Sequence, residues 1–216
     1  MAAISQTTVC NMALSHVGAK SHIESIQEKS NEADAFRLWW DFSLLECLES
    51  YDWSFARTRT PQGSSLALDG DVPPDEWQFR YQYPADCVKA RMIWNPVGPT
   101  ADAVPFALEL NSQGVRTILT NMGNPILVYT KLVTNLSLFI PIFISLLSRC
   151  LAQHVAFQLT GDQKIVDAQV AQYGALLRLA PAVDANEMVP SQPRDAEWIR
   201  GRTFDPKNYG YPGIRY

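Results

Sequence analysis

The spacing of apolar residues changes twice along this chain, and that change is the feature that most limits its fold. Towards both ends, apolar side chains recur every three or four residues, the period of an amphipathic helix. Between residues 77 and 133 they alternate or form short runs, as in β-strands. We therefore expect an α+β fold, mainly α: a four-helix core with a small antiparallel β-subdomain inserted between its second and third helices.

Four segments carry the helical period, and we expect helices over residues 7–17, 31–52, 141–159 and 162–180. The segment 31–52 is apolar on more sides than one helical bundle is expected to cover. Pro141 fits the first turn of the third helix, whereas Pro181 is expected to stop the fourth. The break between the last two helices is short, which favours an antiparallel hairpin.

Five segments between the helices have the composition of strands, namely 77–83, 88–94, 106–110, 115–120 and 126–133. Short strands with short connections predict an antiparallel meander. The chain then divides into four parts. They are the first half of the helical core (1–60), a loop with the β-subdomain (61–134), the second half of the core (135–180) and an extended C-terminal arm (181–216).

Composition narrows the class of protein. The chain has 216 residues, of which 47% are apolar and 19% charged, enough for a core that needs no disulfides. The net charge of −4 argues against a protein that coats DNA. The cysteines at positions 10, 47, 87 and 150 are too far apart in sequence for a close zinc-binding pair, so we expect buried free thiols. With neither a signal-peptide pattern nor an apolar run long enough for a bilayer, no membrane association is expected.

No motif of a known active site occurs in the sequence. We find no H-E-x-x-H, G-x-S-x-G, Walker A or dinucleotide-binding glycine pattern, and we predict no catalytic, cofactor-binding or metal-binding residues. His16 and His154 lie on apolar helical faces, where a core or interface role is expected. Replacing His16, His22 or His154 with Asn should therefore alter stability or assembly and abolish no turnover. A glycosidase stays open as an alternative, since its two carboxylates need no fixed spacing.

The segment 181–216 differs from the rest, with five prolines, five aromatic residues and no visible period. We expect an extended arm that docks on a neighbouring subunit or another protein, the alternative being a solvated terminus. The expected contact residues are four aromatic anchors and three basic partners for acidic groups: Trp198, Phe204, Tyr209, Tyr211, Arg200, Arg202 and Lys207.

Three stretches, in this order, resemble a known family. They are VCNMALSHVGAKSHIESIQEKSNEADAFRLWWD (9–41), LESYDWSFARTRT (48–60) and WQFRYQYPADCVKARMIW (77–94). The sequence is similar, over about residues 4–180, to the tail tubular protein A family, the head-to-tail adaptors of short-tailed bacteriophages. Residues 53–56 (Trp-Ser-Phe-Ala) and 81–87 (Tyr-Gln-Tyr-Pro-Ala-Asp-Cys) match segments of that family. Ile140, before Pro141, departs from the acidic residue often found there.

The resemblance implies a structural role without cofactors. Such adaptors form a twelve-subunit ring between the portal protein and a tail nozzle of the tail tubular protein B type. Genomic DNA passes through the ring without sequence-specific binding. The implied location is the neck of the virion, and the host cytoplasm during assembly. Two alternatives stay open: a head-completion or stopper protein of a long-tailed phage, and a virion-associated hydrolase.

Overall fold

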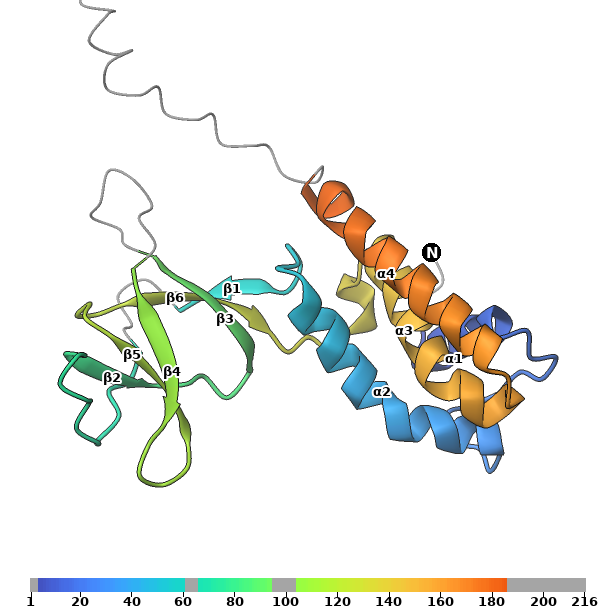
Figure 1. The fold of residues 1–216 in the computed structure, drawn as a ribbon, viewed down its shortest axis with the longest axis horizontal. Coiled ribbons are helices and arrows are strands. Elements are labelled where there is room, and N and C mark those ends of the chain that lie inside the picture. The colour runs from blue at the N-terminus through green and yellow to red at the C-terminus, as the bar shows by residue number, and fades with distance from the viewer. Residues whose placement is uncertain (1–3, 61–65, 95–103, 186–216) are drawn as a thin grey trace, which may run out of the picture.

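The computed structural model describes residues 4–60, 66–94 and 104–185 of the chain. Within them, the helices form one body and the strands a second body beside it (Figure 1). The strands lie between the second and third helices in sequence, so the predicted α+β fold with its inserted antiparallel β-subdomain is confirmed. The helices are α1 (Gln6–His16), α2 (Asn31–Ser50), α3 (Pro141–Thr160) and α4 (Gln163–Ala185).

Local sequence explains where the helices begin. The hydroxyl oxygens of Ser5 and Ser30 accept hydrogen bonds from backbone N–H groups in the first turns of α1 and α2, groups that have no partner inside a helix. Before α3, a short 3-10 helix, η1 (Leu136–Leu138), leads into Pro141, whose missing N–H costs nothing at that position. The start and end of α1 and α2 lie within two residues of the predicted positions.

The centre of the helical body is α3, against which α1, α2 and α4 all pack. The sequence prediction of no run long enough for a bilayer counted only the apolar residues 136–147; by length and composition, the whole helix could cross a membrane. More than half of its apolar stretch is nevertheless buried within the protein, and Leu146, Leu147 and Leu151 are fully buried. Burying each such leucine contributes about 1.5–3 kcal/mol. In this fold, α3 is therefore a core helix.

The fourth helix does not stop at Pro181, contrary to the sequence prediction. It continues to Ala185 with Pro181 inside it, although an internal proline removes a backbone donor and costs about 3 kcal/mol in a helix interior. The buried carboxylate of Asp184, in the turn that follows, accepts hydrogen bonds from the backbone N–H and the hydroxyl of Ser54. These bonds hold the last turn on the core. The predicted start of the arm at residue 181 is therefore wrong, because residues 181–185 are helical.

All strand pairs in the described part of the chain are antiparallel, as predicted. One sheet has the order β1-β6-β3 and is built from Arg57–Arg59, Ile126–Lys131 and Cys87–Trp94. The other has the order β2-β5-β4 and is built from Phe79–Gln82, Arg116–Thr120 and Phe106–Leu110. A meander pairs strands in sequence order, whereas here β2 pairs with β5 and β3 with β6. The meander prediction is therefore wrong, and β1 was not predicted.

The two bodies have separate apolar cores. The β-subdomain buries Tyr81, Ile93, Ile118 and Leu127 in a small core of its own. In the helical core, the indole of Trp53 is fully buried and donates to the backbone oxygen of Cys47 at 2.8 Å. The same ring lies 5.0 Å from the ring of Phe143, edge to face. Trp53 stands just before β1, so the segment 53–56 anchors the helical body at the point where the chain enters the sheets.

Candidate functional site

A stripe of exposed apolar side chains follows one side of α2. Leu38, Phe42 and Leu45 are 68%, 54% and 42% exposed, and their spacing of four and three residues places them on one face of the helix. The opposite face of α2 is buried against the core, with Phe36, Leu44 and Leu48 among its members. The predicted excess of apolar surface on this helix is therefore present.

The surroundings of the stripe are acidic and aromatic. Helix α2 carries five acidic side chains and one arginine, Arg37, which forms an ion pair with Asp34 in its own helix. Next to Phe42, the ring of Trp39 stacks on the imidazole of His154 from α3, with centroids 4.6 Å apart and planes 6° from parallel. Phe157, one turn beyond His154 on α3, is also exposed. The apolar surface therefore continues from α2 onto α3.

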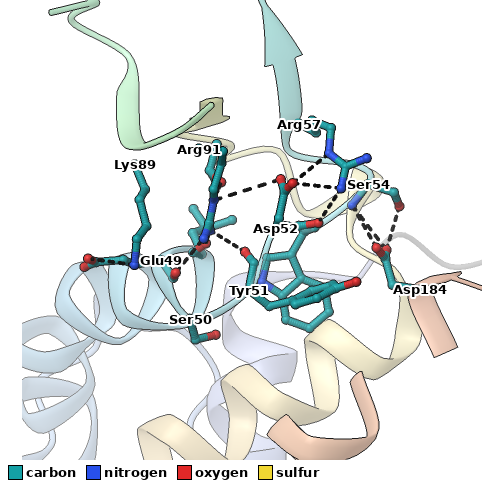
Figure 2. Close-up of polar contacts among 12 residues, drawn as sticks. Glu49, Ser50, Tyr51, Asp52, Ser54, Arg57, Lys89, Arg91 and Asp184 are labelled. Carbon is teal, nitrogen blue, oxygen red and sulfur yellow. Dashed lines mark hydrogen bonds and ion pairs between the residues drawn. The ribbon is translucent and has the colours of Figure 1, made fainter. Parts of the chain in front are cut away.

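The C-terminal end of α2 is fixed by an arginine from the sheet (Figure 2). Arg91 of β3 donates through Nη2 to the backbone oxygens of Leu48, Glu49 and Tyr51, at 3.2, 3.1 and 2.5 Å. The last carbonyls of a helix lack partners and carry partial negative charge. The last turn of α2 has no basic residue of its own. Arg91 therefore supplies the complementary positive charge from the β-subdomain. This contact joins the β-subdomain to the end of the helix that carries the stripe.

Other ionic contacts surround this junction (Figure 2). The Asp52 carboxylate lies 2.8 Å from Arg57 Nη2 and 4.0 Å from Arg91 Nε. Lys89 of β3 lies 3.5 Å from the Glu49 carboxylate at the end of α2. An open hollow of about 600 Å³ adjoins this region, and Glu49, Tyr83, Lys89, Glu109 and Arg116 are among its lining residues. Its charges are mixed in sign, so the hollow has no preference for an anion or a cation.

One cluster of reactive groups lies inside the α2–α3 interface. Glu46 Oε2 is 3.0 Å from His154 Nε2 and 3.4 Å from Cys150 Sγ. The pKa of the Cys150 thiol falls to about 7, because the Cys47 thiol and then His154 hydrogen-bond to it, against the opposing effect of burial. A Cys–His–Glu set can act as a nucleophile when its thiolate reaches a substrate. Cys150 has no exposed surface, so this arrangement offers no access for nucleophilic catalysis.

The other predicted residues fall into three groups: the arm residues, the cysteines and the remaining histidines. The seven arm residues, Trp198, Arg200, Arg202, Phe204, Lys207, Tyr209 and Tyr211, lie outside the described residues. The four cysteines are free thiols, three of them buried as predicted and Cys87 half-buried. His16 is half-buried, with Nε2 3.1 Å from the hydroxyl of Ser148, and His22 is exposed.

Comparison with known proteins gives no family assignment: no family model matches the chain, and no curated protein matches it. Evidence about function therefore comes from the residues and their arrangement. Sequence reasoning missed the Glu46–Cys150–His154 cluster, because it looked for pairs of cysteines close in sequence and gave His154 a core or interface role. One signal was available, since Cys150 and His154 are four residues apart and so share a helical face.

Proposed function

We propose that this chain is a structural virion protein, a head-to-tail adaptor of a short-tailed bacteriophage. In this proposal, copies of the chain form a ring between the portal and the tail nozzle, and the ring lines the DNA channel. The ordered resemblance over residues 9–41, 48–60 and 77–94 supports the family. The main support for ring formation is the exposed apolar stripe on α2, which consists of Leu38, Phe42 and Leu45.

An exposed apolar stripe of this kind favours association. Exposed side chains that line up along a helix and continue onto its neighbour form a patch, and such patches mark protein–protein contacts. A head-to-tail contact between identical subunits closes into a ring when the rotation between them fits a whole number of copies. In the proposed ring, the stripe of one subunit is covered by a different surface of the next subunit.

The charge of the chain suits a channel through which DNA moves. Proteins that hold DNA do so mainly through basic contacts to phosphates. This chain has 22 acidic and 18 basic residues, and α2 is markedly acidic. A ring of such subunits would not hold the genome by its phosphates, so DNA could slide. The proposed role is structural and requires no catalytic centre.

The proposed ring is tested by adding purified chain to purified portal rings and counting bound copies by native mass spectrometry. We expect a closed ring of chains on each portal, with twelve copies as the count that the resemblance implies. Phe42→Glu should prevent closure without loss of folding, because Phe42 is more than half exposed. Leu110→Glu is the matched control, since Leu110 is an exposed apolar residue of the β-subdomain. One or two bound copies without a closed ring would contradict the proposal.

The arm is a separate part of the proposal. Residues 198–216 contain four basic residues and one acidic residue, so they complement an acidic surface such as α2 or an acidic patch of the portal. At about 3.3 Å per extended residue, these 19 residues could reach roughly 60 Å, enough to contact another subunit. A chain truncated after Ala196 should melt like the full chain and fail to join portal rings. If it joins them equally well, the arm has no role in assembly.

A further inference from the structure

Three side chains of different types converge on one point between α2 and α3. Glu46, Cys150 and His154 each offer one ligand atom, and these atoms lie within 4.8 Å of one another. Cys150 and His154 are four residues apart on α3, so they project from one side of that helix. Glu46 reaches the same point from α2. Carboxylate, thiolate and imidazole are all ligands that proteins use for zinc.

The distances are close to those that a tetrahedral ion imposes. With the usual zinc bond lengths to N, O and S, tetrahedral angles place N and O ligands about 3.4 Å apart and S and O ligands about 3.6 Å apart. The corresponding distances here are 3.0 Å from His154 Nε2 to Glu46 Oε2 and 3.4 Å from Cys150 Sγ to the same oxygen. For these two pairs, outward movements of a few tenths of an ångström reach the tetrahedral spacing, and the third pair, Cys150 Sγ and His154 Nε2, lies within 4.8 Å.

Neighbouring side chains hold the ligands in place. The indole of Trp39 stacks on the His154 ring, and Phe42 meets the same ring edge to face at 5.5 Å. The amide of Gln153 lies 3.5 Å from the other carboxylate oxygen of Glu46 and 3.8 Å from Cys150 Sγ. Such outer contacts fix ligand orientation in known metal sites.

Charge and access also suit a divalent ion. A thiolate and a carboxylate together balance two positive charges, which matters here because Cys150 is buried. The side chains of His154 and Glu46 are 20% and 32% exposed, so solvent reaches these two ligands, and Cys150 would complete the site from the buried side. Three-ligand zinc sites take a water molecule as their fourth ligand, and in the proposed site it would come from the side on which His154 and Glu46 meet solvent.

We propose that Glu46, Cys150 and His154 bind one zinc ion at the α2–α3 interface. The ion joins the two helices directly beneath the apolar stripe, because Trp39 and Phe42 contact its histidine ligand. This site is independent of the proposed function: metal binding can fail while rings form, and rings can fail while metal binds.

The test is a titration of the purified full chain, first stripped of metal by a chelator, with Co²⁺ and then Zn²⁺. We expect uptake of one equivalent of cobalt, with a thiolate-to-cobalt charge-transfer band in the near ultraviolet. Zinc should displace the cobalt, abolish the band and raise the melting temperature. His154→Gln and Glu46→Gln should each weaken cobalt binding at least tenfold.

Two matched variants serve as controls. His16→Gln changes another half-buried histidine, and Glu49→Gln changes another carboxylate of α2; both should bind cobalt as the original chain does. Circular dichroism establishes that each variant is folded. The proposal is overturned if the original chain shows no charge-transfer band, a result that needs no variant. It is also overturned if folded His154→Gln and Glu46→Gln bind cobalt with unchanged affinity.

Discussion

The carboxylate of Asp184 accepts a hydrogen bond from the hydroxyl of Ser54 at 2.6 Å, although 130 residues separate them in sequence. The backbone N–H of Ser54 also donates to both carboxylate oxygens, at 3.2 Å. The contact joins the last turn of α4 to the segment through which the chain leaves the helical core (Figure 2). A buried carboxylate that accepts several hydrogen bonds stabilises a fold more than a surface ion pair does.

Replacing this carboxylate should destabilise the whole helical core. We expect Asp184→Asn to lower the free energy of unfolding by about 2 kcal/mol, because hydrogen bonds to a charged group contribute about 1.5–3 kcal/mol. Urea denaturation followed by circular dichroism measures the change. Asp167→Asn, an exposed position on the same helix, is the control and should change stability by less than about 0.5 kcal/mol.

Proline 181 provides a test of how the end of α4 is held. Pro181 is exposed and lies inside the helix, so Pro181→Ala restores a backbone N–H that can bond to the preceding turn. We expect the free energy of unfolding to rise by about 1 kcal/mol, a part of the cost of a proline inside a helix. Pro141→Ala is the control: Pro141 occupies the first turn of α3, where proline is favourable, so no gain is expected. Equal effects of the two changes would show that Pro181 is not strained.

Much of the helical part could be predicted from local sequence. The apolar period fixes α2, and serines such as Ser30 mark helix starts by capping. The extension of α4 past Pro181 could not be predicted in this way. It depends on Asp184 meeting Ser54, a contact between distant segments that no local pattern encodes.

The sheets and the candidate metal site likewise depend on contacts between distant segments, which local sequence does not predict. Alternation identified the strands but not their partners, because pairing β2 with β5 depends on how the chain folds back. Strand β1, with the sequence Arg-Thr-Arg, has no apolar alternation to detect. Glu46 and Cys150 are 104 residues apart, so only packing of α2 on α3 brings them together.

Arg91 should be the residue on which attachment of the β-subdomain depends most. Its guanidinium binds three carbonyl oxygens at the end of α2 and is mostly buried. We expect Arg91→Met to lower the free energy of unfolding by about 2–3 kcal/mol, since those carbonyls lose a charged donor. Arg91→Lys should recover only part of this loss, because lysine lacks the planar fork.

The matched control for this arginine is Arg116→Met. Arg116 is exposed and lies over the ring of Tyr83 at 5.3 Å, a contact that contributes about 0.5–1 kcal/mol at an exposed site. Urea denaturation of both variants, read by tryptophan fluorescence, gives the comparison. If Arg91→Met lowers the free energy of unfolding no more than Arg116→Met does, the hydrogen bonds of Arg91 to the end of α2 do not hold the two bodies together.

His16 should make stability depend on pH. Burial, and then the positive charge of Arg149, lower the pKa of His16 below its ordinary value of 6.5. The folded chain therefore takes up a proton at this site less readily than the unfolded chain does. By linkage, the contribution of neutral His16 to the free energy of unfolding is fully present above about pH 6.5. It is lost as the pH falls from there through the folded-state pKa.

The measurement compares the original chain with His16→Asn by urea denaturation between about pH 8 and pH 5. We expect the original chain to lose stability relative to the variant as the pH falls, because only the original chain has this histidine to protonate. Arg149→Gln should keep part of the effect, since burial is the larger cause of the lowered pKa. An NMR titration of the His16 ring, in the original chain and in Arg149→Gln, measures the lowered pKa directly. A difference in stability that stays constant across this pH range would show that His16 does not change its protonation with folding.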